Sequence, residues 1–242
     1  MPVRLRGDMH MHTTVSDGRD PPDRVVLAAH ERGLDFIAVT DHDSFEGAIR
    51  ARRAAEGMGL DIIVVVGNEV RTTRGDVLVY CAGKVPDRLP RDPLELVDYM
   101  HEEGCLVVPA HPFDKRRKGV GDLVYEARWD AIEVFNAHSD PFSNRRAQEA
   151  ARELGLPGLA NSDAHIADAV GSAYNIVEAE DADEEAILRA IRGGRVTPVP
   201  GRPGFGVYAS TLAWSIERRL RRRRGGGPSR LDYLGEGEEP EF

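Results

Sequence analysis

Helix-like and strand-like segments alternate along most of the chain. Stretches rich in Ala, Arg and Glu end near a glycine, and a short apolar run follows each, as in VVLAAHERGLDFIAVTDHD and LVDYMHEEGCLVVPAHP. Glycine just after a helix favours a left-handed C-terminal cap. Unbroken apolar runs are typical of strands that are covered on both faces. The repeated helix-then-strand order therefore predicts parallel strands in an α/β fold.

The apolar runs predict about seven strands and one further strand. The expected ranges are residues 5–10, 36–40, 62–67, 77–81, 106–110, 131–135 and 158–161, with the further strand near 175–177. The repeating unit and the strand count favour an irregular barrel over an open sheet. We expect this barrel to occupy residues 1–200.

The pattern changes after about residue 201, where a C-terminal extension (201–242) begins. Leu212, Ile216 and Leu220 recur at helical spacing, an arginine run follows, and the chain ends in the acidic GEGEEPEF. This helix could dock on the barrel or on a partner, and its arginines could contact RNA or a membrane surface. We favour a solvated helix end followed by a disordered acidic segment. Deletion from Arg218 onward is accordingly expected to spare hydrolysis of a small ester.

Composition and charge narrow the class of protein. The 242 residues are 41% hydrophobic and 30% charged, as in a soluble globular protein. A net charge of -9 argues against binding nucleic acid by bulk charge, although a local basic groove stays open. The longest apolar run, residues 62–66, falls far short of the ~20 residues of a membrane span. Cys81 and Cys105 lie in apolar stretches and are expected to be free thiols. With no signal-peptide segment at the N-terminus, the expected location is cytoplasmic.

Metal-ligand residue types follow almost every predicted strand. The strand ends read DMHMH, TDHD, GNE, AHP, FNAHS and NSDAH. In a parallel barrel all strand C-termini lie at one face, so residues far apart in sequence meet there. Chance can supply one or two such endings, but six predicted strands that all end in metal-ligand residue types indicate a shared site.

The residue types in these endings favour a centre with several metal ions. Residues two apart on a strand point to the same side, so His10 and His12 can bind one ion together. Glu69 offers a carboxylate that can bridge two ions. The further candidates are Asp17, His42, His111, Asp163 and His165. The mixture of imidazoles and carboxylates suits zinc, manganese or iron better than calcium or magnesium alone.

The order DMHMHTTVSDG, TDHDS, GNE, AHP and SDAH resembles the polymerase and histidinol phosphatase (PHP) family over roughly four fifths of the chain. The resemblance implies a distorted (β/α)7 barrel with two or three divalent metal ions that hydrolyses phosphate esters. It implies that the first metal is bound by His10, His12, Glu69 and Asp163, the second by Glu69 and His111, and the third by Asp17, His42 and His165. Many relatives have a histidine where this chain has Asp76, which we expect to ligate the second metal.

Further roles are expected from residues beside these ligands. His165 or Asp43 could protonate the leaving alkoxide. Cationic side chains after the ligand-bearing strands could hold a phosphate. The candidates for substrate contacts are Arg19, Lys115, Arg116, Arg117, Asn136 and His138. The expected substrate is a phosphate mono- or diester, such as a nucleotide, an oligonucleotide end or a small phosphorylated metabolite.

Two other functions stay open at this point. PHP-type barrels also serve as non-catalytic scaffolds and as nucleic-acid-associated subunits, but a scaffold has no physical need for so many clustered ligands. A metal-dependent amidohydrolase is the other alternative, yet no lysine ends a core strand as a carbamylated metal bridge would require. His30 and His101 lie in predicted helices and are expected to have no role in the site.

Overall fold

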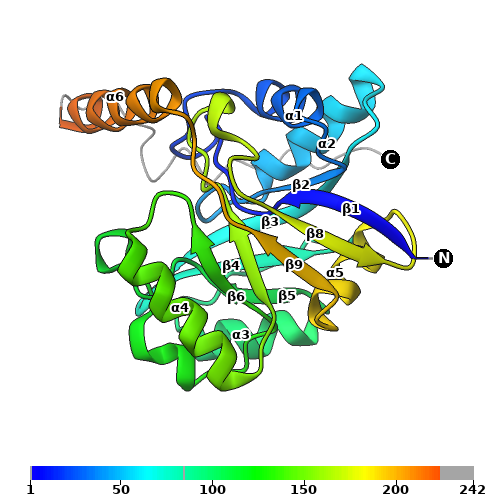
Figure 1. Cartoon of the computed structure of the whole chain (residues 1–242), viewed down its shortest axis with the longest axis vertical. Coiled ribbons are helices and arrows are strands. Elements are labelled where there is room, and N and C mark those ends of the chain that lie inside the picture. Colours follow the sequence, from blue (N-terminus) through cyan, green and yellow to red (C-terminus); the bar gives the residue numbers. More distant parts are fainter. Residues whose placement is uncertain (1, 84, 224–242) are drawn as a thin grey trace.

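The computed structural model describes residues 2–83 and 85–223, in which the strands form a curled mixed sheet and a separate pair (Figure 1). The strands are β1 (Val3–Asp8), β2 (Phe36–Val39), β3 (Ile63–Thr72), β4 (Gly75–Cys81), β5 (Leu106–Pro109), β6 (Ile132–Asn136), β7 (Gly158–Asn161), β8 (Tyr174–Ala179) and β9 (Val196–Val199). The helices are α1 (Pro22–Glu31), α2 (Glu46–Met58), α3 (Pro93–Glu102), α4 (Pro141–Leu154), α5 (Glu184–Arg192) and α6 (Phe205–Arg223), with short 3₁₀ turns η1 (Lys115–Arg117), η2 (Gly121–Tyr125) and η3 (Ala167–Ala169).

The strand directions correct the expectation of an all-parallel sheet. The order in the large sheet is β5-β4-β3-β2-β1-β8-β9, and only β1–β2 and β2–β3 pair in parallel. β4 is antiparallel to β3 and β5, and β8 is antiparallel to β1 and β9. β3 and β4 form a hairpin, in which Gly75 has a φ of 134° that other residues rarely adopt. A buried apolar run has the same composition in either direction, so the sequence pattern could not reveal these reversals.

The second pair of strands brings the curled sheet close to a barrel. β6 and β7 pair in parallel, β5 lies beside β6, and β7 lies beside β8 and β9. The amide of Asn175 joins β8 to β7, since its Nδ2 donates to Ala160 O at 2.9 Å and its Oδ1 accepts from Ala160 N at 2.8 Å. The α/β barrel-like architecture is therefore confirmed, but the strand order does not follow a regular (β/α)7 repeat.

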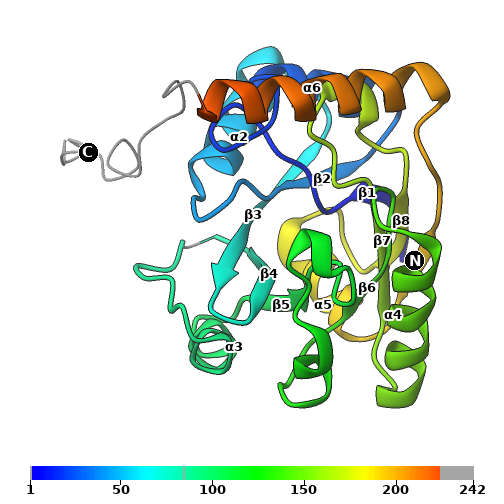
Figure 2. The same ribbon diagram turned by 90° about the vertical axis from the view of Figure 1, so that its left-hand side faces the viewer.

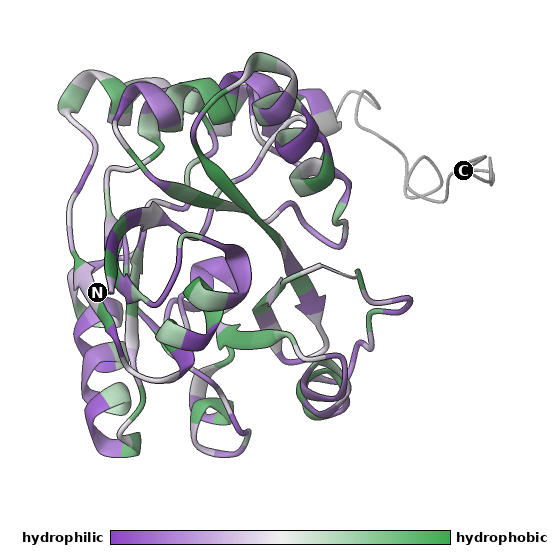
Figure 3. Ribbon diagram, turned by 90° about the vertical axis from the view of Figure 1, so that its right-hand side faces the viewer, coloured by the Kyte–Doolittle hydropathy of each residue, from purple (hydrophilic) through white to green (hydrophobic). Residues whose placement is uncertain are grey.

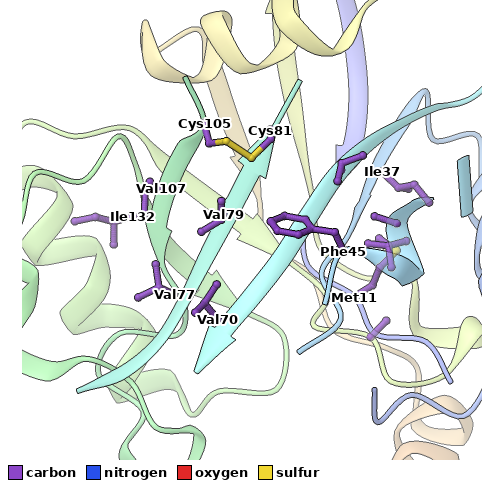
Figure 4. Close-up of a cluster of buried hydrophobic side chains, with 14 of the residues drawn as sticks. Met11, Ile37, Phe45, Val70, Val77, Val79, Cys81, Cys105, Val107 and Ile132 are labelled. Carbon is purple, nitrogen blue, oxygen red and sulfur yellow. A yellow bond between two sulfur atoms is a disulfide. The ribbon is translucent and has the colours of Figure 1, made fainter. Parts of the chain in front are cut away.

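Both faces of the large sheet are buried, which explains its continuous apolar strands. Phe36, Leu78 and Leu106 pack with residues of α5 in one cluster. Their neighbours Ile37, Val79 and Val107 belong to the other cluster, together with side chains of α1 to α4 (Figure 4). In Figure 3 the strands through the centre are largely green, whereas the covering helices alternate between green and purple. The predicted glycine caps are confirmed at Gly59 and Gly155, which end α2 and α4 in the left-handed conformation.

The two cysteines are joined, contrary to the expectation of free thiols. Cys81 ends β4 and Cys105 directly precedes β5, and a disulfide links them across a Cα–Cα distance of 4.4 Å (Figure 4). The antiparallel pairing of β4 and β5, which the sequence pattern did not predict, brings the residues together. The disulfide removes the argument that free thiols made for a reducing compartment. Within residues 2–83 and 85–223, no helix combines the length and apolar character that a membrane crossing demands.

Candidate metal centre

The predicted ligands meet at one end of the barrel. β1, β2, β3 and β5 all run toward this end. The chain leaves β1, β2 and β5 into ligand-bearing segments, whereas Glu69 lies within the last part of β3. Two isolated parallel bridges, Met11 with Ala164 and His42 with Glu69, hold neighbouring segments side by side. The hairpin returns β4 from the same end, so its first residues also lie there. The local backbone thus gathers residues that are up to 155 positions apart in the chain, from His10 to His165.

Four buried side chains surround the centre of the site. Nε2 of His10 lies 3.2 Å from Nε2 of His12. Oε2 of Glu69 is 3.3 Å from the first nitrogen and 3.2 Å from the second. Oδ1 of Asp163 is 3.6 and 3.4 Å from the same two atoms. These are the residues that the family resemblance assigns to the first metal.

Glu69 also faces the second group of ligands. Its Oε1 lies 3.0 Å from Nε2 of His111, while its Oε2 faces the imidazoles of His10 and His12. The two oxygens therefore point to different neighbours, as a carboxylate that bridges two cations requires. Asp76 stands at the start of β4, opposite Arg71, and is buried. Among the described residues it joins none of the groups of converging ligand atoms, so its role as a ligand stays a prediction.

The third group lies on the other side of His12. Oδ1 of Asp17 is 3.3 Å from Nε2 of His165 and 3.7 Å from Nδ1 of His12. Oδ2 of Asp17 is 3.7 Å from Nε2 of His42, whose Nδ1 is 3.3 Å from Glu69. The three predicted ligands of the third metal are thus neighbours, and they adjoin the first group through His12.

The donor atoms of these residues fit divalent cations. Four overlapping groups each place three ligand atoms within 4.8 Å of one another. Buried atoms that make no hydrogen bond within the described part of the chain include His12 Nδ1, His42 Nδ1, His111 Nδ1, Asp17 Oδ1, Asp76 Oδ1 and Asp163 Oδ1. A buried polar atom without a partner costs about 1–3 kcal/mol, so this concentration of them calls for ligands. Imidazole and carboxylate donors together suit zinc, manganese or iron.

Opposite charges inside the site strongly shift the pKa values of its carboxylates and imidazoles. Burial would raise the pKa of Asp163, but Arg117 and His10 hold it well below its usual value. Burial would likewise raise the pKa of Glu69, yet His42 and His10 keep it low. Burial would lower the pKa of His12, but Asp163 and Glu69 raise it to about 10. The carboxylates are therefore ionised, and the site attracts positive charge.

The sequence pattern missed Glu133, which orients two of the predicted ligands. Its Oε1 lies 3.0 Å from Nδ1 of His10, and its Oε2 accepts from the backbone N of His111 at 2.6 Å. When Nδ1 of His10 carries the proton, its Nε2 is left with a lone pair toward the centre. Glu133 is 1% exposed and is the single charged residue of β6. A charged residue inside an apolar strand is the signal that could have identified it.

Two predicted ligands have a strained backbone. His111 has a φ of 31° and Asp163 a φ of 51°, both in the left-handed region that disfavours side chains. Such conformations cost about 1–3 kcal/mol each and persist where surrounding structure enforces them. Here the side chain of His111 faces Glu69, and the side chain of Asp163 faces His10 and His12. Neither conformation could be predicted from the sequence.

A cavity of about 560 Å³ opens onto these ligands. Arg116 and Arg117, two of the candidate substrate contacts, line it together with Arg71 and Lys118. The side chain of Arg117 also reaches the carboxylate of Asp163. The cavity is thus anionic at its floor, where metals are expected, and cationic along its wall.

The remaining predicted substrate contacts are placed differently from one another. His138 lines the cavity, and its Nε2 is buried without a hydrogen-bond partner in the described structure. Asn136 is fully buried instead, and its Nδ2 donates to Asp163 at 3.0 Å. Neither Lys115 nor Arg19 is among the residues that line the cavity. Arg19 forms ion pairs with Asp20 and Asp168 instead.

The two predicted proton donors also differ in position. His165 lines the cavity, with its Nδ1 3.0 Å from the carbonyl oxygen of Asp163 and its Nε2 facing Asp17. Asp43 does not line the cavity; its Oδ1 accepts from the backbone N of Arg71 at 2.9 Å and pairs with Arg91. The positive φ of Asp43, 56°, turns it in this direction. The structure therefore argues against Asp43 as the acid.

Helix α6 lies across one end of the barrel (Figure 2). It docks there, which was the alternative to the solvated helix end that we favoured from the sequence. The helix contributes several residues to the cavity wall, namely Tyr208, Thr211, Leu212, Trp214, Ser215, Arg218 and Arg219. Nε1 of Trp214 donates to the carbonyl oxygen of Asp17 at 3.0 Å. Arg218 donates to the same carbonyl at 3.1 Å and forms an ion pair with the carboxylate of Asp17. The predicted acidic end lies outside the described residues.

Comparisons with known proteins agree with the geometry of the site. The model of the PHP domain matches residues 8–124, and the model of the PHP-associated region matches residues 141–196. An uncharacterised protein of Methanocaldococcus jannaschii is 28% identical over 156 residues, which cover 59% of this chain and 89% of that protein. A 5'-3' exoribonuclease of Haemophilus influenzae is 37% identical over 65 residues, but these cover only 27% of this chain and 23% of the relative.

A solved structure has a similar fold over most of the chain. It is a two-domain protein from Bacteroides vulgatus, described as containing a predicted PHP-like metal-dependent phosphoesterase. The TM-score is 0.70 at 20% identity, and the match covers 83% of this chain and 66% of that one. The order of the motifs, their convergence at one end of the barrel and the two matching models lead to one conclusion. The chain belongs to the PHP domain family.

Proposed function

We propose that this protein is a phosphoesterase that hydrolyses a phosphate mono- or diester with two or three divalent metal ions, manganese, zinc or iron. The observation that carries the proposal is the distribution of charge in the cavity, where carboxylates and imidazoles lie together and arginines line the wall. Overlapping ligand groups around Glu69 and His12 form the floor of the cavity, and arginines stand above them. A phosphate ester is an anion whose reaction develops further negative charge, which is the charge that such a site stabilises.

The metal ions, when bound, supply a nucleophile by lowering the pKa of water and stabilise charge on the phosphoryl oxygens. His10, His12, Glu69 and Asp163 would hold the first ion, Glu69 and His111 the second, and Asp17, His42 and His165 the third. Asp76 is proposed as a further ligand of the second ion. Since His165 faces Asp17 and Asp163 with its two nitrogens, we assign it the role of a ligand rather than of the acid.

The wall of the cavity would bind the substrate. Arg116 and Arg117 line the cavity in the segment that follows the ligand His111, and guanidinium groups pair well with phosphate oxygens. His138 has a buried Nε2 with no partner in the described structure, so it can hydrogen-bond to an ester or phosphoryl oxygen. A nucleotide, an oligonucleotide end or a small phosphorylated metabolite would meet these requirements. Similarity to an exoribonuclease over a short segment supports a nucleic acid or nucleotide among these.

The first experiment combines metal analysis with an assay. We would measure the metal content of the purified protein, and then hydrolysis of an aryl phosphate monoester and diester with and without added manganese. Two or three ions per chain are expected, with turnover of at least one ester. His10→Ala should abolish turnover because it removes a ligand at the centre of the site. Relative rates on the two esters rank monoester against diester chemistry.

The other outcomes separate the alternatives. A protein that binds no metal and hydrolyses neither ester under any metal would contradict the proposal and favour a scaffold. Bound metal with hydrolysis of amide substrates in place of phosphate esters would favour an amidohydrolase. Glu149→Gln, on the exposed face of α4, is a matched control that should change neither metal content nor rate.

A further inference from the structure

An arginine of the C-terminal helix occupies part of the third ligand group. Arg218 forms an ion pair with Oδ2 of Asp17 and hydrogen-bonds to its carbonyl oxygen. Oδ1 of Asp17 instead faces His165 at 3.3 Å and makes no hydrogen bond within the described chain. A positive side chain from α6 therefore shares this carboxylate with the neighbouring imidazoles.

We propose that Arg218 and a third divalent cation compete for Asp17, so that docking of α6 weakens the third metal site and a cation bound there weakens the docking of α6. The inference rests on the metal centre of the proposed function. It goes further by naming a residue of this chain that controls how many ions are held. With α6 docked, the site keeps two ions firmly and the third one weakly.

Charge and geometry both support this competition. A guanidinium in contact with Asp17 repels a cation bound to the same carboxylate, and it also fixes Oδ2 away from coordination. The side chain of Arg218 is 23% exposed and that of Asp17 is 6% exposed, so solvent screens the repulsion only in part. Arg117 pairs with Asp163, which also faces His165 of the third ligand group. A third cation thus meets the positive charge of two arginines.

Most described side chains of helix α6 are exposed, which favours its release. Its main neighbour is η3, and Val207 and Trp214 pack against the core. Much of its apolar surface faces outward, with Phe205 89% exposed, Ile216 51% and Leu220 48%. The contacts of Trp214 and Arg218 with Asp17 are therefore a large part of what fixes the helix over the cavity. A cation that attracts Asp17 would act directly on that anchor.

The test measures cation affinity in the full chain, independent of turnover. Metal-free protein is titrated with Zn²⁺ by calorimetry, and metal content is checked after dialysis. Arg218→Gln should raise the affinity of the weakest site by about tenfold or more, within the usual range of coupling between sites. Arg218→Lys keeps the charge and should stay closer to the unmodified protein. The matched control Arg221→Gln removes a charge on the same helix that pairs with Glu217 and does not line the cavity, and it should leave the affinity unchanged.

The reverse effect is measured on Trp214. The chain has two tryptophans, and Trp129 is only 4% exposed in the core. Binding of Zn²⁺ at the weakest site should shift Trp214 emission and raise its quenching by iodide, and Trp214→Phe should remove this response. An emission signal unchanged throughout the titration would overturn the coupling.

Failure of this inference differs from failure of the proposed function. If Arg218→Gln leaves every site with its original affinity, Arg218 does not compete and the inference is wrong, even while two ions bind and esters are hydrolysed. If Arg218→Gln loses cation affinity, the guanidinium supports Asp17 and the inference is also wrong. If no variant binds Zn²⁺, both the metal centre and the inference fall.

Discussion

Two buried glutamates have different positions and different expected roles at the centre of the site. Glu69 faces Nε2 atoms of His10 and His111, so its oxygens lie where cations are expected. Glu133 faces Nδ1 of His10 and the backbone of His111, and amide groups of Asn136 and Asn161 hold it in place. The first glutamate is thus a candidate ligand, and the second fixes the orientation of ligands.

We predict that Glu133→Gln weakens metal binding by about 10–100-fold, the usual effect of losing a partner behind a metal ligand. The substitution keeps the shape but removes the charge that holds Nδ1 of His10 in its protonated form. Calorimetric titration of metal-free protein with Zn²⁺ measures the change, and circular dichroism verifies the fold. An affinity equal to that of the Glu149→Gln control would show that Glu133 serves packing alone.

At the scale of elements, the β3–β4 hairpin places one wall of the site. The chain reverses at Gly75, so that β4 starts at the end of the barrel where the predicted ligands meet, and Asp76 lies beside them. A Cβ atom on Gly75 would approach the Cα of Val120 at 2.7 Å and the carbonyl oxygen of Lys118 at 2.8 Å. The hairpin is therefore packed directly against the loop that carries the cavity cations.

We predict that Gly75→Ala destabilises the protein by about 2 kcal/mol or more, because strain at positive φ adds to the contact with backbone atoms. The matched control is Gly57→Ala in α2, where a Cβ meets nothing within 4 Å. There the helix should gain about 0.5–1 kcal/mol. Urea unfolding of the two variants measures both effects, and equal stabilities would refute the prediction.

At the scale of the whole molecule, the barrel brings several negative carboxylates together, and this arrangement requires positive charge nearby. Asp17, Glu69 and Asp163 are buried within one site, and the pKa of each is held well below its usual value against the effect of burial. Protonated histidines and arginines balance part of this charge. Cations bound only by the folded chain must therefore stabilise it.

We predict that divalent metal raises the melting temperature of the metal-free protein by about 10 °C. At a free metal concentration about 1,000 times Kd, binding contributes about 4 kcal/mol, and each kcal/mol shifts Tm by about 2–4 °C for a chain of this size. Differential scanning calorimetry after removal of metal by a chelator, with Zn²⁺ then restored, measures the shift. His10→Ala should reduce it strongly, and an equal shift in that variant would point to binding elsewhere.

The amino-acid sequence by itself determined the class of fold and the ligands that could meet. Buried runs and glycine caps are local properties, so the positions of the strands through β8 were predicted closely, though β9 was missed. The polar residues that follow these runs are local too, and His10, Glu69, His111 and Asp163 converge in the structure as the motifs predicted.

Only the tertiary structure decided how distant segments pair. The reversed directions of β4 and β8, the disulfide between Cys81 and Cys105, and the position of α6 over the site all depend on contacts between residues far apart in sequence. A short apolar run does not record which neighbour it will have or in which direction it will run. Arg218 has the sequence context of a solvated helix end, and its contact with Asp17 exists because the barrel brings position 17 beneath that helix.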